Sequence, residues 1–176
     1  MTAFSAAKAA AFTKAYHPNT RMDDYRTPRY ILDYIEETFG QINRDGACHE
    51  TNKTGDPIDL FSGELMKMGE VLFVNPPWST PEVKRFVEAA SRQVDAGATV
   101  VFLLPNKLCE VSWVNDVIGY FDNIILLGGR VDFAGPFSVK KGATRFGTFI
   151  GVMGKGRENN PIVEGVTLRH LKEIYL

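Results

Sequence analysis

The stretch Val71–Trp78 reads VLFVNPPW, and the interpretation of the whole chain starts from it. Four consecutive apolar residues, Val71–Val74, are typical of a strand that is buried on both faces of a sheet. The strand must end at Asn75, because proline lacks the N–H that a sheet ladder needs and two prolines follow. The sequence therefore predicts a stiff corner that presents an amide side chain at the carboxyl end of a buried strand. In open α/β sheets, ligands bind at that edge.

The corner carries groups that suit an amine attached to an aromatic ring. The lone pair of such an amine is delocalised into the ring, so two acceptors that bind its hydrogens favour a pyramidal, nucleophilic nitrogen. The Asn75 side-chain oxygen is one acceptor, and the backbone carbonyl of Pro76, whose ring fixes the backbone, can be the second. Trp78 offers a flat face for a base, and such stacking is typically worth about 1–3 kcal/mol. In the alternative interpretation, Asn-Pro-Pro merely ends the strand and Trp78 packs over the sheet edge as core.

Regular elements are predicted on both sides of the corner. A helix that ends at Gly97 and a second buried strand over Ala98–Pro105 follow it, which gives a right-handed strand–helix–strand unit. Upstream, Thr27 as N-cap and Gly40 as C-terminal cap delimit an amphipathic helix. Residues 1–22 are predicted to form an N-terminal helical extension to a domain over residues 23–176.

Composition limits the class of protein. The chain has 176 residues, 44% of them hydrophobic and 23% charged, which fits one globular α/β domain. Its formal net charge of −1 gives no overall basic surplus, so any nucleic-acid contact must rest on a local patch. The apolar runs have strand length, so we expect no membrane span. Cys48-His49-Glu50 is a poor metal site because adjacent residues rarely point at one centre, and we expect no bound metal.

The motifs resemble those of a known family. Asn-Pro-Pro-Trp after an apolar strand is similar to motif IV of amino-group methyltransferases that use S-adenosylmethionine. With Tyr25-Arg26-Thr27-Pro28 upstream and Leu-Leu-Pro downstream, the chain resembles the phage-type DNA adenine methyltransferases from roughly Asp24 to Met153. The resemblance implies methylation of the exocyclic amine of adenine in double-stranded DNA, with the base flipped out of the helix. It implies a single doubly wound, mostly parallel α/β sheet of about seven strands with an antiparallel edge hairpin.

The resemblance also implies roles for particular residues. The catalytic corner would be Asn75, Pro76, Pro77 and Trp78. The cofactor, S-adenosylmethionine, would be held by an aromatic-x-Thr-Pro element, by an acidic residue at the end of the first strand and by a later carboxylate: Tyr25, Thr27, Pro28, Asp45, Ala47 and Asp59. Asp-Gly-Ala-Cys departs from the Asp-x-Cys-Ala order of the family, which leaves the register of these contacts open. Asp45 with Gly46, and Asp59, also fit plain surface turns.

Basic residues later in the chain are candidates for DNA contacts. Arg130, Lys140, Lys141 and Arg145 are interleaved with phenylalanines, a pattern that suits phosphate contacts and base packing. A solvated loop would look the same. Two other functions remain compatible with the motifs: methylation of an RNA base or a glutamine amide, and a binding module that has kept the fold without the activity. We expect a location in the cytoplasm of a bacterium or an infected host, and the sequence does not indicate an oligomeric state.

Overall fold

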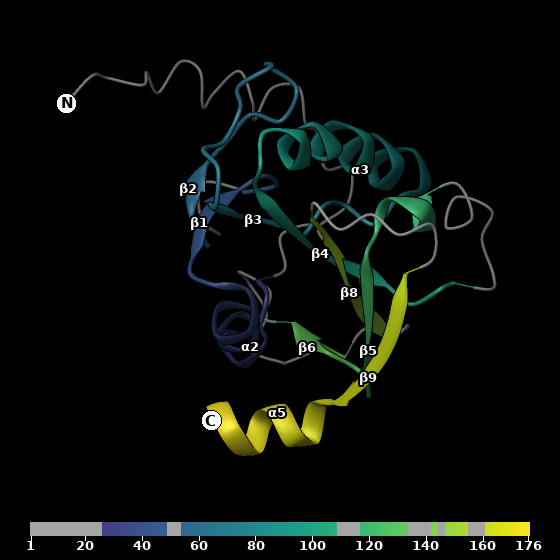
Figure 1. Ribbon diagram of the computed structural model, residues 1–176. Coiled ribbons are helices and arrows are strands. Elements are labelled where there is room, and N and C mark those ends of the chain that lie inside the picture. The colour runs from purple at the N-terminus through teal and green to yellow at the C-terminus, as the bar shows by residue number, and fades with distance from the viewer. Residues whose placement is uncertain (1–25, 49–53, 109–116, 134–141, 144–146, 155–160) are drawn as a thin grey trace.

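A computed structural model of the protein describes residues 26–48, 54–108, 117–133, 142–143, 147–154 and 161–176 (Figure 1). The helices are α2 (Arg29–Phe39), α3 (Thr80–Asp95), the 3-10 helix η1 (Ile118–Tyr120) and α5 (Leu168–Tyr175). The strands are β1 (Ile42–Asp45), β2 (Asp56–Pro57), β3 (Val71–Val74), β4 (Thr99–Pro105), β5 (Asn123–Gly128), β6 (Asp132–Phe133), β7 (Gly142–Ala143), β8 (Thr148–Met153) and β9 (Ile162–Thr167). The predicted helical extension over residues 1–22 lies outside the described residues.

The main sheet has seven strands in the order β2-β1-β3-β4-β8-β5-β9. β8 runs antiparallel to both of its neighbours, β4 and β5, and the remaining pairs are parallel. The predicted α/β class and mostly parallel sheet are thus confirmed. Because β1, β3, β4, β5 and β9 all run in one direction, their ends meet along one side of the sheet, which we call the carboxyl edge.

The antiparallel strand lies in the interior of the sheet rather than at its edge, as Figure 1 shows between β4 and β5. The predicted edge hairpin is wrong in this respect. All six residues of β8 are buried, as two covered faces and two paired neighbours require. The edge is occupied by β9, in which every residue is exposed except the half-buried Val166, as expected of a strand with one free side.

Helices cover both faces of the sheet. α3 packs on one face, and α2 and α5 pack on the other (Figure 1). β3 serves both layers, because Leu72 and Val74 belong to the core on the α3 side while Val71 and Phe73 belong to the core on the α2 side. Fully burying such a side chain stabilises the fold by about 1.5–3 kcal/mol. The apolar run that precedes the Asn-Pro-Pro corner therefore also anchors the centre of the sheet.

The sequence predicted the end of α2 correctly, but it predicted the wrong N-cap residue. Gly40 follows the helix with φ of 101°, a left-handed conformation that glycine adopts without strain, so the predicted end is confirmed. The start is different: Pro28, not Thr27, is the N-cap residue, and no side chain caps the helix. The Thr27 hydroxyl instead contacts the residue that ends β3.

None of the helices that the structure describes combines the length and apolar character that crossing a bilayer requires.

Candidate functional site

The corner that follows β3 lies on the carboxyl edge, beside the end of β1. β3 ends at Val74, one residue before the predicted end at Asn75, and Asn75 leaves the sheet half-buried. Asp45, the last residue of β1, pairs with Phe73 of β3, so the acidic residue and the Asn-Pro-Pro corner occupy neighbouring strands. The structure thus brings together Asp45 and Asn75, which are 30 positions apart in the sequence (75 − 45).

Two hydrogen bonds fix the orientation of the Asn75 amide. Its Nδ2 donates to Thr27 Oγ1 over 3.2 Å, and its Oδ1 accepts from Trp78 Nε1 over 3.2 Å. Thr27 is 9% exposed and is held at the start of α2, so its hydroxyl is a fixed acceptor. The amide oxygen of Asn75 is consequently turned away from Thr27. An amide oxygen has two lone pairs, and the indole of Trp78 uses one of them, so the other can accept a further hydrogen bond.

Trp78 packs against the core as well as against Asn75. The indole is half-buried and meets the ring of Phe133 edge to face, with centroids 5.4 Å apart and an angle of 84° between the planes. It adjoins the core layer under α2. The alternative interpretation of Trp78 as a core residue therefore describes part of its environment. Phe133 was not among the predicted site residues, and no sequence signal beyond its aromatic side chain marks it.

Asp45 is buried and holds the loop that follows β1. Its Oδ1 accepts from the Ala47 amide over 3.0 Å and its Oδ2 from the Thr54 amide over 3.1 Å. Burial raises the pKa of its carboxyl group to about 6, against the opposing effect of these hydrogen bonds. Gly46 packs tightly at this turn, because a Cβ there would lie 2.8 Å from Leu60 Cδ1. Asp45 is thus more than a surface turn residue, since it organises the loop that carries Ala47.

Asp59 lies in a turn after β2. Its Oδ1 accepts from the Phe61 amide over 2.9 Å, and its backbone carbonyl accepts from the Ser62 amide over 3.2 Å. This is the geometry of the turn carboxylate that the sequence left open as an alternative.

The predicted DNA contacts fall partly within the described chain. Arg130 follows β5, is exposed, and lines a shallow hollow beside α5. Lys140, Lys141 and Arg145 lie outside the described residues, as does the predicted cofactor contact Tyr25.

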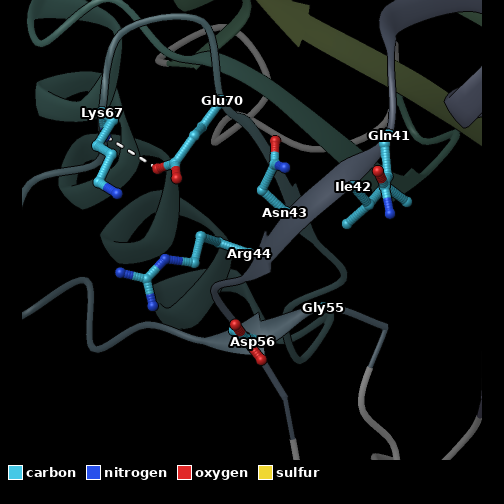
Figure 2. Close-up of a pocket in the computed structure, with 8 residues that line it drawn as sticks. All are labelled: Gln41, Ile42, Asn43, Arg44, Gly55, Asp56, Lys67 and Glu70. Atoms are coloured by element: carbon cyan, nitrogen blue, oxygen red, sulfur yellow. Dashed lines mark hydrogen bonds between the residues drawn. The ribbon is translucent and has the colours of Figure 1, made fainter.

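A second hollow, of about 580 Å³, lies at the opposite edge of the sheet (Figure 2). It is formed where β1, β2 and β3 begin, and its lining residues are Gln41, Ile42, Asn43, Arg44, Gly55, Asp56, Lys67 and Glu70. Figure 2 shows the hydrogen bond between the Lys67 amide and the Glu70 carboxylate, 2.9 Å long. None of the predicted site residues lines this hollow, so the candidate site is the carboxyl edge.

Comparison with known proteins identifies the family of the chain. The family model described as DNA N-6-adenine-methyltransferase (Dam) matches residues 14–154. The DNA N-6-adenine-methyltransferase of Escherichia phage T1 is 28% identical over 92 residues, which span 50% of this chain and 38% of that protein. A Listeria monocytogenes structure assigned to the class I S-adenosylmethionine-dependent methyltransferases superposes with a TM-score of 0.54. It has 12% sequence identity, and the match covers 96% of this chain and 75% of that one, which supports the fold. Because the family model matches most of the sequence, the chain belongs to the DNA N-6-adenine-methyltransferase (Dam) family.

Proposed function

We propose that the protein transfers the methyl group of S-adenosylmethionine to the exocyclic amine of adenine in double-stranded DNA. The observation that carries the proposal is the orientation of Asn75, whose amide is fixed at the carboxyl end of β3 by Thr27 and Trp78. Membership of the Dam family and the methyltransferase-like sheet support the same reaction.

Asn75 acts as a preorganised acceptor for the amine of the base. The bond to Thr27 uses an amide hydrogen, so the amide cannot rotate to present its nitrogen to the substrate without losing that bond. The indole of Trp78 uses one lone-pair site of Oδ1 and leaves the other for an N–H of the target amine. The Pro76 carbonyl is the second acceptor, fixed before substrate arrives by the proline ring. Acceptors already in place need no reorganisation when the reaction occurs.

Trp78 has two roles in this proposal. Its N–H steadies the Asn75 oxygen, and the exposed part of its half-buried ring offers a stacking surface for the flipped adenine. The edge contact with Phe133 limits how far the indole can turn. The same ring thereby positions both the acceptor and the substrate.

The residues around the corner fit the cofactor. The first turn of α2 has no side-chain cap, so its free N–H groups and the positive end of the helix dipole suit the carboxylate of the methionine moiety. Asp45 lies at the end of β1 near this edge and would face the ammonium group, with Ala47 in the loop that Asp45 holds. Asp59 and Pro28 complete the proposed set, whereas the Thr27 hydroxyl is engaged by Asn75. When bound, S-adenosylmethionine supplies an electrophilic methyl carbon.

The test is transfer of a labelled methyl group to unmethylated DNA by the native protein and by Asn75→Ala. We expect N6-methyladenine after digestion to nucleosides. The substitution should cost at least about 3 kcal/mol of transition-state stabilisation, comparable with removal of a positioned hydrogen-bonding group. Gln41→Ala is the matched control, because it removes an exposed amide at the opposite edge of the sheet. Label recovered only in RNA or in glutamine would overturn the DNA assignment, and no transfer at all would overturn the activity.

A further inference from the structure

We propose that the shallow hollow between β5 and α5 binds phosphates of the DNA backbone near the flipped base. This α5 hollow has a volume of about 490 Å³ and is lined by Gly128, Gly129, Arg130, Leu168, Arg169, Lys172 and Glu173. The inference rests on the proposed function, because it assigns the surface that holds the substrate of that reaction. It also gives a role to the C-terminal helix, in which the sequence showed no chemistry.

The charges of the α5 hollow favour an anion. Arg130, Arg169 and Lys172 line the hollow together with one carboxylate, that of Glu173, and Lys172 also pairs with Asp132 over 3.4 Å. Arg169 pairs with Glu173 over 2.9 Å, with its side chain 89% exposed, and such exposed pairs contribute only about 0–1 kcal/mol. A phosphate can therefore compete for the guanidinium group at small cost. Arg130 forms no ion pair or hydrogen bond with any residue in the described ranges.

Two glycines line the hollow: Gly128, which ends β5 and pairs with Thr167, and Gly129, which follows it. Gly128 and Gly129 are exposed and carry no side chain that could shield their peptide groups. Gly129 has φ of 129°, and a Cβ there would lie 3.2 Å from Leu168 Cδ1, so a larger residue would be strained and would crowd α5. Positive side chains around exposed glycine backbone form a surface that a sugar–phosphate chain can approach closely.

The α5 hollow is connected to the catalytic corner through β6. Lys172 contacts Asp132 over 3.4 Å, and the next residue, Phe133, packs on Trp78. β5 and β9 also end on the carboxyl edge, where Asn75 ends β3. A base inserted beside Asn75 brings its own backbone over this edge, and along each strand a phosphate follows every ~3.4 Å of helix axis. β5 lies three strands from β3 in the sheet, roughly 14 Å at ~4.8 Å per strand, so the hollow would contact phosphates a few steps along the backbone from the flipped base.

The α5 side of this surface lies outside the part of the chain that matches the family, whereas Arg130 lies inside it. The family model ends at residue 154, whereas β9 and α5 begin at residues 162 and 168. A chain with formal net charge −1 does not attract DNA as a whole, so the basic side chains of the hollow have to act locally. We infer that α5 contributes a phosphate contact that the family match does not contain.

The experiment compares the double variant Arg130→Gln, Arg169→Gln with Glu173→Gln and with the control Lys67→Gln, an exposed lysine at the opposite edge. Binding of a fluorescent duplex and the KM for DNA are measured between about 50 and 200 mM salt, and thermal unfolding checks that each variant is folded. The double variant should raise KM for DNA roughly tenfold at the lowest salt, with kcat unchanged. The slope of log Kd against log salt should fall by about 0.9 for each phosphate that the variant no longer neutralises.

Glu173→Gln provides a test of opposite sign, because removal of a competing carboxylate should tighten DNA binding by roughly twofold to fivefold. Lys67→Gln should leave binding and its salt dependence unchanged. If the native protein methylates DNA but the double variant keeps the native KM and salt slope, or Glu173→Gln weakens binding, the α5 hollow is not the phosphate site and the proposed function stands. If the native protein transfers no methyl group to DNA, the proposed function fails and this inference fails with it.

Discussion

Thr27 and Asn75 lie 48 positions apart in sequence, and the hydrogen bond between them assigns Thr27 a role different from the one implied by the family resemblance. The resemblance places Thr27 against the cofactor. In the structure its hydroxyl accepts the N–H of the residue proposed to bind adenine. We therefore propose that Thr27 is a positioning residue, which determines which side of the Asn75 amide faces the proposed substrate.

Thr27→Val should lower kcat about tenfold, because loss of one buried hydrogen bond costs about 1–1.5 kcal/mol and frees the amide to rotate. Thr27→Ser keeps the acceptor and should restore most of kcat, and the dissociation constant for S-adenosylmethionine should stay near the native value in both. The matched control is Thr38→Val, which removes an exposed hydroxyl bonded to the Tyr34 carbonyl at the other end of α2. A raised dissociation constant for the cofactor with unchanged kcat would return Thr27 to the cofactor site.

Asp45 gives a prediction on pH. Its pKa is raised from 3.8 to about 6, so the folded protein holds a proton that the unfolded chain releases at lower pH. The free energy of unfolding therefore loses up to about 3 kcal/mol from this group as pH rises from about 4 to 6, and changes little above that. Asp45→Asn cannot titrate, so its stability relative to the native protein should rise across the same window. Urea unfolding of both proteins at several pH values measures the difference, and a difference that is independent of pH would contradict the prediction.

At the scale of the elements, one glycine of β8 makes room for an aromatic ring that packs on the face of the sheet. A Cβ on Gly151 would lie 2.7 Å from Cε1 of Phe121, a ring that packs edge to face on Phe102 and Phe149. The ring cannot move aside without disturbing these contacts. The glycine therefore leaves room in the core layer under α3.

Gly151→Ala should destabilise the protein by about 1–3 kcal/mol through overpacking. Gly165→Ala on the edge strand β9 is the matched control, because a Cβ there meets nothing within 4 Å. It should leave the free energy of unfolding unchanged or raise it by less than about 1 kcal/mol. The urea concentrations at half-unfolding give both changes in the free energy of unfolding, provided that the slope of this free energy against urea concentration is the same in all variants. Equal effects of the two substitutions would show that the contact with Phe121 does not limit the packing.

Strands and helices were predictable where local chemistry alone sets them. Two prolines end β3 and a glycine ends α2, and both boundaries agree with the structure to within one residue. The position of β8 was not predictable, because a run of apolar residues shows that a strand is buried without showing which strands it pairs with. The same limit applies to the site. Asn75 was predictable from the prolines beside it, but its bond to Thr27 and the contact of Trp78 with Phe133 depend on how distant segments meet.

At the scale of the whole molecule, the cofactor should stabilise the folded state if the carboxyl edge binds it. At one hundred times its dissociation constant, S-adenosylmethionine should raise the free energy of unfolding by about 2.7 kcal/mol. Asn75→Ala should keep this stabilisation while it loses methyl transfer, since Asn75 is proposed to contact the base. Thermal unfolding with and without the cofactor measures the effect. An absent shift in the native protein would favour a module that has kept the fold without the activity.

The order of the strands has a consequence for biosynthesis. β4 ends at residue 105 and β5 at residue 128, yet the strand that joins them is not complete until residue 153. While the protein is being made, β4 therefore lacks a partner on its inner side, and β5 lacks both of its partners in the main sheet, because β9 follows β8 in the chain. The central gap closes only when a late segment inserts between strands synthesised earlier. A nascent chain arrested shortly before Thr148 should consequently be open to proteases and chaperones along its middle, and not only at its growing end.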